Sequence, residues 1–387
     1  MSEASPAAPT RTLQSTRLPR GAVLVFAGTR PECIKLAPVV RALAGRRFAG
    51  TIVVNSGQHA EAVRRSFAEF DIRCDLELPQ LEPAANLATA TGRLTRVLAS
   101  AIARIRPALT VVQGDTLTAY CGARAAVLAD CPVAHVEAGL RAPSASDPFP
   151  EEWFRRQIAR HADLHFAPSP SAFANLLAEG IPSERIHCTG NTGVDSLRGV
   201  IEAGAIDGRG GDRKDVLVTL HRRENWDSKA DGICDALMEI CERVPSVHMT
   251  VPIHPNPRIA SRLRRRLGQH RQFTLSAPMA YRNFISAVAR ASLVISDSGG
   301  IQEEVAHLGV PLIVPRSCTE RPECLATGFV RVVGTRCEDL VREALDMLAQ
   351  PRRAALAFDG EAPFGDGTAG RRIVEVLESM LVDAEAA

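Results

Sequence analysis

Short apolar runs alternate along this chain with stretches of helical spacing, and this alternation constrains the fold more than any other feature. The apolar runs lie at residues 22–27, 51–55, 109–113, 133–136, 164–167, 186–188, 216–219, 247–251, 273–275, 293–295, 312–314 and 330–333. Strands that alternate with helices form parallel sheets covered on both faces. More than ten strands in 387 residues favour two doubly wound domains over a single sheet. The likeliest linker lies within residues 189–213, which end in a glycine-rich stretch.

Composition limits the partners of the chain. The formal net charge is +2 and only 4% of residues are aromatic, which argues against a large nucleic-acid or membrane footprint. No apolar run approaches the ~18 residues of a membrane-spanning helix. The ten cysteines show neither C-x-x-C nor zinc spacing, so we expect reduced core residues, no metal and a cytoplasmic setting. Residues 1–20 are rich in Ser, Ala, Pro, Thr and Arg, which predicts a disordered tail.

One turn has the chemistry of an anion site. Ser298, Gly299 and Gly300 connect the apolar run at 293–295 to a stretch of helical spacing. A strand that turns through glycines into a helix leaves backbone N–H groups free to bind phosphate, and the helix dipole adds to the attraction. Glu304, nearly two helical turns on, is suited to ribose hydroxyls. The pattern is that of a nucleotide site, and an ordinary strand–turn–helix with a flexible loop is the alternative.

Charged residues follow several of the other predicted strands. Asp115 follows the run at 109–113, Glu137 ends the run at 133–136, and His221 follows the run at 216–219. Because ligands bind at the carboxyl ends of parallel strands, these side chains are candidates for one site. Asp115 is either a helix cap or an active-site group. Glu137, a charge so close to a core strand, must be paired or functional.

Three further charged segments can each be interpreted in two ways. Glu151 and Glu152 open a helix, where acids are usually dipole partners, but Arg141, Arg155 and Arg156 are near enough in sequence to pair with them. Residues 319–323, which include Arg321, form either a loop clamped by internal ion pairs or a lid on a nucleotide. The arginines after His221 are suited to phosphate oxygens, although a solvated loop of charges has the same composition.

Ten motifs occur in an order that resembles one enzyme family, the non-hydrolysing UDP-N-acetylglucosamine 2-epimerases. They are GTRPECIK (28–35), SGQH (56–59), QGDT (113–116), HVEAGLR (135–141), PEE (150–152), TGN (189–191), HRREN (221–225), SDSGGIQEE (296–304), TERPE (319–323) and GDG (365–367). The resemblance implies a GT-B fold, an α/β architecture of two Rossmann-like doubly wound parallel-sheet domains with the active site in the cleft between them. It implies a catalytic domain at 21–195, a UDP-binding domain at 196–367 and a C-terminal helix at 368–387 that crosses back to the first domain.

The family reaction inverts C2 of UDP-GlcNAc to give UDP-ManNAc, by anti elimination of UDP to a 2-acetamidoglucal and re-addition of UDP. The resemblance implies no cofactor and a homodimer. Carried over residue by residue, it implies a catalytic set of Asp115, Glu137, Glu151 and His221. It also implies a substrate-binding set of Arg30, Lys35, Ser298, Gly299, Gly300 and Glu304. We add His254, a polar residue that follows a predicted strand, and Arg321, from the possible nucleotide lid, as further candidates for substrate binding.

The chain departs from the family pattern at several positions. Trp153 and Phe154 stand where a small residue and Asn are usual, and they could reshape the sugar pocket. Cys33 and Cys318 also replace more usual residues. These changes leave open another UDP-2-acetamido sugar as substrate. A hydrolysing 2-epimerase is the nearest alternative, followed by a GT-B glycosyltransferase and by an inactive nucleotide-sugar-binding regulator.

Overall fold

A computed structural model of the chain describes residues 21–46, 50–144, 148–204, 214–222, 225–226, 228–350 and 363–386. The predicted disordered tail at 1–20 and the glycine-rich end of the predicted linker lie outside these residues. The chain divides into two compact units, the first formed by Met1–Asp195 with Gly367–Ala387 and the second by Ser196–Asp366. The boundary falls inside helix α7 (Thr192–Glu202), so a helix occupies the first half of the segment in which we expected the linker.

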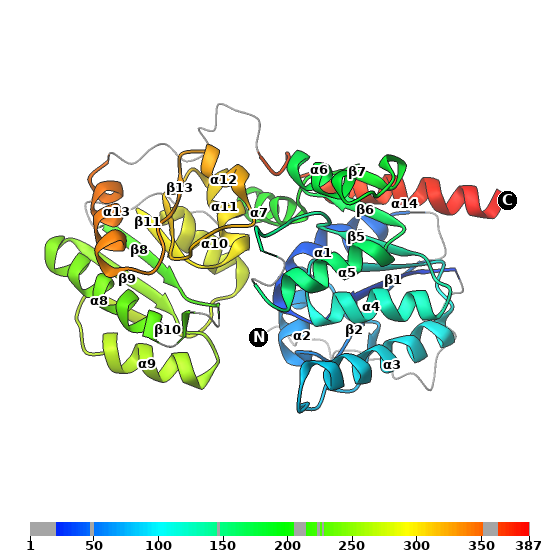
Figure 1. Cartoon of the computed structure of the whole chain (residues 1–387), viewed down its shortest axis with the longest axis horizontal. Helices are drawn as coiled ribbons and strands as arrows, with labels where there is room; N and C mark the ends of the chain where they lie inside the picture. Colours follow the sequence, from blue (N-terminus) through cyan, green and yellow to red (C-terminus); the bar gives the residue numbers. More distant parts are fainter. Residues whose placement is uncertain are drawn as a thin grey trace, which may run out of the picture. The chain divides into compact units, whose positions relative to one another are not determined.

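The first unit is a seven-stranded parallel sheet with helices on both faces (Figure 1). Its strands are β1 (Val23–Ala27), β2 (Thr51–Asn55), β3 (Leu76–Glu77), β4 (Leu109–Gln113), β5 (Val133–Val136), β6 (Leu164–Ala167) and β7 (Ile186–Cys188). Its helices are α1 (Arg30–Leu43), α2 (Ala60–Ala68), α3 (Leu87–Ile105), α4 (Leu117–Leu128), α5 (Glu151–His161), α6 (Pro170–Ala178), the 3₁₀ turn η1 (Ser183–Arg185) and α14 (Ala369–Ala386). The sequence pattern missed only β3 among these strands, because two residues are too few to show a period.

The second unit is a six-stranded parallel sheet. Its strands are β8 (Lys214–Thr219), β9 (Val247–Pro252), β10 (Phe273–Ser276), β11 (Leu293–Ser296), β12 (Leu312–Val314) and β13 (Val330–Val332). Its helices are α8 (Ser228–Arg243), α9 (Pro257–Leu267), α10 (Tyr281–Arg290), α11 (Gly299–Leu308), α12 (Pro322–Ala326) and α13 (Cys337–Ala349). No helix within the described ranges is long and apolar enough to cross a membrane.

In both sheets the order in which successive strands are added reverses at an equivalent point. The strand order is β3-β2-β1-β4-β5-β6-β7 in the first unit and β10-β9-β8-β11-β12-β13 in the second. The order therefore switches between β1 and β4 in one sheet and between β8 and β11 in the other. Doubly wound sheets bind ligands outside the carboxyl ends of the strands at such switch points. The predicted GT-B architecture of two Rossmann-like units is confirmed.

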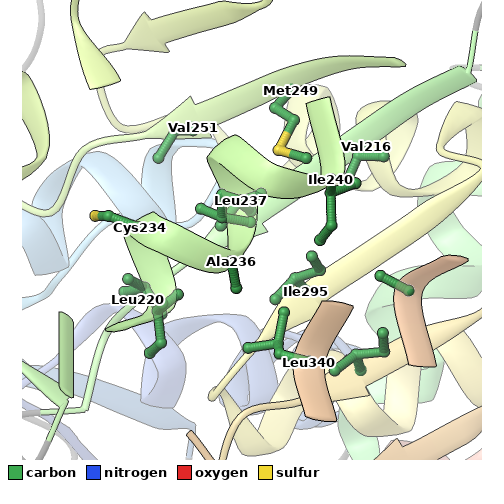
Figure 2. Packing of buried hydrophobic residues seen from close by; sticks show 14 of the residues in the cluster. Val216, Leu220, Cys234, Ala236, Leu237, Ile240, Met249, Val251, Ile295 and Leu340 are labelled. Atoms are coloured by element: carbon green, nitrogen blue, oxygen red, sulfur yellow. The ribbon is translucent and has the colours of Figure 1, made fainter. Parts of the chain in front are cut away.

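Apolar strand residues form a core on each sheet. In the second unit, Leu237 and Ile240 of α8 pack against Val216, Met249 and Ile295 of the sheet (Figure 2). Cys234 joins this cluster, and six of the ten cysteines are buried and unpaired, as expected for small core residues.

The C-terminal helix α14 belongs to the first unit, where it packs on α1. Asp195 accepts hydrogen bonds from the backbone N–H groups of Ala369 and Gly370 at 3.1 and 2.8 Å, which fixes the start of α14. Gly370 lies so close to Pro38 of α1 that an added Cβ would stand 2.9 Å from the Pro38 carbonyl carbon. The backbone contact therefore requires glycine at this position.

Candidate active site

Three neighbouring strands of the first unit end in predicted site residues. β1 pairs with β4, and β4 pairs with β5, so the turns that follow these strands share one edge of the sheet. Arg30 is half-buried at the start of α1, just after β1, while Asp115 follows β4 and Glu137 follows β5. The fold thus brings the predicted carboxylates to the switch point, on neighbouring strands.

Glu137 is the most constrained of these carboxylates. Its backbone φ is +65°, a left-handed conformation that residues other than glycine rarely adopt. Its side chain is 8% exposed and accepts hydrogen bonds from Lys35 Nζ and Gln113 Nε2, both at 2.5 Å from Oε2. Strained backbone persists only where the surrounding structure imposes it, and such strain clusters at functional sites. A strained, buried and paired carboxylate is therefore the strongest single sign of chemistry in this unit.

Asp115 does not cap helix α4, which was one of the two interpretations of this residue from the sequence. The side chain of Thr116 caps α4 by accepting the N–H of Ala119 at 3.0 Å. Asp115 is partly exposed and pairs with Arg155, whose guanidinium also binds Glu152. Because Arg155 is almost fully buried between two carboxylates, it fixes the position of the Asp115 side chain.

The two acids at the start of α5 differ sharply. Glu152 is fully buried, accepts the backbone N–H of Ala142 at 3.0 Å and pairs with Arg155 and Arg156. Glu151 is half-buried, and its carboxylate belongs to the first helical turn. The expected partnership with Arg155 and Arg156 therefore holds for Glu152, whose role is structural, and leaves Glu151 as the acid suited to a ligand.

One part of the sequence interpretation of this region needs correction. Arg141 does not pair with Glu151 or Glu152, because its guanidinium binds Glu179 at 2.6 Å. Trp153 and Phe154 pack against Tyr120 of α4, with ring centroids 5.1 and 5.0 Å apart. These contacts fix the two rings against α4, and their effect on a sugar pocket stays a prediction.

In the second unit, the loop after β8 is anchored to the turn after β11. Asp297 is fully buried and accepts the backbone N–H groups of His221 and Arg222 at 2.8 and 3.1 Å and the side-chain amide of Asn225 at 2.9 Å. β8 and β11 are the two strands at the switch point of this sheet. His221 is thus presented at the switch point by a buried carboxylate that neighbours the glycine turn.

The imidazole of His221 also contacts a second predicted site residue. Its ring lies 5.6 Å, centroid to centroid, from the ring of His254, which follows β9. The His254 ring in turn lies 5.0 Å from the indole of Trp226, and its Nδ1 accepts the N–H of Asn256 at 3.0 Å. The predicted residues His221 and His254 therefore lie side by side, although they come from different strands.

The glycine turn begins α11, as predicted. Ser298 is the N-cap residue, and Gly299 and Gly300 form the first turn of the helix. A Cβ on Gly300 would meet no described atom within 4 Å, whereas a Cβ on Gly299 would lie 2.3 Å from Nη1 of Arg321. Gly299 therefore leaves room for the Arg321 guanidinium, while Gly300 presents open backbone at the positive end of the helix dipole.

Arg321 is buried and held by two acids, which confirms that residues 319–323 are clamped by internal ion pairs. Its Nε lies 2.5 Å from Glu303 and its Nη1 lies 2.9 Å from Glu320. Glu320 also pairs with Arg222 and Arg316. Glu304, the neighbour of Glu303 on α11, is only half-buried. Of the two acids, Glu303 serves Arg321 and Glu304 is the one accessible to a ligand.

Each unit thus gathers its own share of the predicted residues. Arg30, Lys35, Asp115, Glu137 and Glu151 belong to the first, and His221, His254, Ser298, Gly299, Gly300, Glu304 and Arg321 to the second. No group of three or more His, Cys, Asp or Glu side chains suited to a metal ion occurs in the part of the chain that the structure describes.

Sequence reasoning missed three residues that hold the predicted ones in place. These are Glu32, Gln113 and Asp297, and all three side chains are buried. Two of them are charged, and a charge inside a strand–turn motif was the available signal, because buried charges require partners. The burial of each group and the identity of its partner could be established only from the structure.

Comparison with known proteins gives the family. The model of the family described as UDP-N-acetylglucosamine 2-epimerase matches residues 41–378. The UDP-N-acetylglucosamine 2-epimerase of Escherichia coli K12 is 36% identical over 369 residues, which cover 92% of this chain and 98% of that protein.

Two solved structures are similar throughout. The UDP-GlcNAc 2-epimerase from Neisseria meningitidis bound to UDP-GlcNAc has a TM-score of 0.86 at 32% identity, covering 92% of this chain and 100% of the other. The enzyme from Methanocaldococcus jannaschii in complex with UDP-GlcNAc and UDP has a TM-score of 0.81 at 32% identity, covering 92% and 99%. With strand-end carboxylates in one unit, a glycine turn in the other and relatives matched along nearly their full length, this chain belongs to the UDP-N-acetylglucosamine 2-epimerase family.

Proposed function

We propose that this protein interconverts UDP-GlcNAc and UDP-ManNAc without net hydrolysis. The observation that carries the proposal is Glu137, a strained and buried carboxylate bound by Lys35 and Gln113 beside the Asp115–Arg155 pair. Inversion at C2 requires groups that remove and return a proton, and carboxylates on neighbouring strands supply them. Relatives whose structures were solved with UDP-GlcNAc bound support the choice of sugar.

The proposed reaction is an anti elimination followed by re-addition. One of Asp115, Glu137 and Glu151 removes the C2 proton. The C–H electron pair forms the C1–C2 double bond of a 2-acetamidoglucal as the C1–O bond breaks and UDP leaves with that bonding pair. UDP then re-adds to C1 while a proton is delivered to the opposite face of C2, so atoms and charges balance. Carboxylates also stabilise the positive charge that builds at C1.

The residues of the second unit have the chemistry of a UDP site. Open backbone at Gly300 and the dipole of α11 attract the diphosphate, and the half-buried Glu304 is suited to ribose hydroxyls. We assign His221 to the departing diphosphate, because Asp297 and the His254 ring hold it at the switch point. Arg30 and Lys35 supply positive charge from the first unit. We further propose a cytoplasmic homodimer, as the family resemblance implies, which light scattering on the purified protein tests.

Proton NMR of UDP-GlcNAc incubated with the pure protein in D₂O tests the reaction. We expect UDP-ManNAc with deuterium at C2 and no free sugar. Free ManNAc with UDP identifies a hydrolysing enzyme instead. Unchanged UDP-GlcNAc contradicts the proposed substrate, and incubation with other UDP-2-acetamido sugars then shows whether one of them is accepted. The D115N variant, assayed beside the wild type, shows whether product formation depends on the described site.

A further inference from the structure

Glu32 is a fully buried carboxylate in the first turn of α1, and the proposed mechanism makes no use of it. Its Oε2 accepts the backbone N–H of Gly28 at 3.1 Å and the hydroxyl of Thr29 at 2.8 Å. Its Oε1 accepts the hydroxyl of Thr116 at 2.8 Å. The first two donors lie in the turn after β1, and the third lies in the turn after β4.

These contacts join the two sides of the switch point. The turn after β1 leads into Arg30, and Thr116 is the residue that follows Asp115. Thr116 donates to Glu32 and accepts the N–H of Ala119, so the same hydroxyl both caps α4 and anchors its turn. A change in the Glu32 side chain therefore reaches Arg30 through one turn and Asp115 through the other.

The carboxyl is expensive to bury. Its partners are a backbone amide and two hydroxyls, and burial raises its pKa from 4.5 to about 7. A buried carboxyl with neutral partners contributes little to stability and costs desolvation energy whenever it ionises. A glutamine of similar size can accept the same N–H group without ionising, so stability alone does not account for a carboxyl at this position.

We propose that Glu32 is a positioning residue, whose tie between the two turns sets the separation of Arg30 and Asp115. The proposal deepens the function given above and rests on Asp115 acting in that reaction. Reacting groups misplaced by about 1 Å lose on the order of 100-fold in rate. Glu32 is fixed by two hydrogen bonds in its own turn and by one hydrogen bond that crosses the switch point to Thr116, and this arrangement holds the groups within such limits.

Three variants and one control test whether the hydrogen bonds of Glu32 position the site, with kcat and KM for UDP-GlcNAc as readouts. E32A removes all three hydrogen bonds, and we expect kcat to fall ~10- to 100-fold while KM changes less than ~3-fold. E32Q keeps an acceptor for Gly28 and Thr29 and a donor for Thr116, so we expect kcat within ~3-fold of wild type. T116S keeps the hydroxyl and should also remain active.

The matched control is D163N. Asp163 accepts the backbone N–H of Val133 at 2.9 Å, at the opposite end of β5 from Glu137. We expect D163N to lose thermal stability without a fall in kcat at a temperature where it is folded. An equal fall in kcat in D163N and E32A assigns the effect to general destabilisation and overturns the proposal.

Four other outcomes distinguish a failure of the positioning role from a failure of the proposed function. Full activity in folded E32A overturns the positioning role alone. Equal losses in E32A and E32Q overturn it as well, because they show that charge rather than the hydrogen-bonded tie matters. Full activity in D115N, or no epimerisation by the wild type, contradicts the proposed function itself and leaves the tie without a reaction to serve.

Discussion

The two sheets carry buried carboxylates at equivalent switch points, and the two carboxylates are held in different ways. Glu32 joins the turns after β1 and β4, and Asp297 joins the turns after β11 and β8. Asp297 binds two partly buried backbone N–H groups and the side-chain amide of Asn225. Glu32 binds one backbone N–H group and two hydroxyls, and hydroxyls can rotate to other partners.

Because of this difference in partners, we infer that Asp297 stabilises its loop, whereas Glu32 adds little to stability. Removing Asp297 leaves backbone donors unsatisfied, and such donors are costly. Removing Glu32 relieves the desolvation that raises its pKa to about 7. We infer that Asp297 serves stability and the presentation of His221 together, whereas Glu32 persists for function at a cost in stability.

We expect the largest loss of turnover for changes at Glu137, the residue with the strained backbone in the first unit. E137Q keeps the shape of the side chain but removes the charge that Lys35 and Gln113 hold. We expect turnover to fall at least ~100-fold, the usual size for an acid–base or charge-stabilising group, and the same for D115N, E151Q and H221A. Steady-state epimerisation rates measure this fall, with E378Q as the control because Glu378 pairs with Arg46 near the surface, away from the predicted site residues. Full activity in any of the four removes that residue from the mechanism.

The second prediction tests the contrast between the switch points directly. D297A leaves the amides of His221 and Arg222 without their acceptor, so we expect their hydrogen exchange to accelerate ~100-fold, or roughly 3 kcal/mol of local stability. In E32A the exchange of the Gly28 amide should accelerate by at most ~10-fold, because relief of carboxyl burial offsets the lost hydrogen bonds. Exchange measured by mass spectrometry compares the two. Equal acceleration at both sites would remove the distinction between them.

The third prediction concerns pH. Since burial raises the pKa of Glu32 from 4.5 to about 7, the folded state binds this proton more tightly than the unfolded state. The resulting stabilisation is complete below pH ~4.5 and is lost as pH rises through ~7, about 2 kcal/mol between pH 5.5 and 8. E32Q does not titrate, so its thermal stability relative to wild type should improve from pH 5.5 to 8. A constant difference across this range contradicts the raised pKa.

The sequence was sufficient to predict the architecture, because apolar strand runs and the polar residues that follow them are local patterns. Asp115, Glu137 and the turn from Ser298 to Gly300 all follow strands, as their neighbours in sequence indicate. The partners of these groups could not be predicted in this way. Arg155 reaches Asp115 across 40 residues and Lys35 reaches Glu137 across 102, and only the fold places such distant side chains together.

The sequence interpretation failed for Arg141. Arg141 lies near the acids of α5 in sequence, yet its guanidinium binds Glu179, which follows α6. Closeness in sequence made Glu151 and Glu152 the expected partners, and only the fold brings Glu179 to the guanidinium.

We expect the smallest effect on activity for changes on α11, where one of two adjacent acids is structural and the other is suited to a ligand. Glu303 pairs with the buried Arg321, and the half-buried Glu304 is the proposed ribose ligand. E304A should raise KM for the UDP-sugar about 10-fold, or ~1.4 kcal/mol, with little change in kcat. E303Q should instead lower thermal stability, because it leaves Arg321 short of a partner. E338Q, on the exposed face of α13, serves as the control for both variants. An unchanged KM in E304A refutes the ribose role. If E303Q raises KM as much as E304A does at unchanged stability, then Arg321 and its clamp contact the substrate directly.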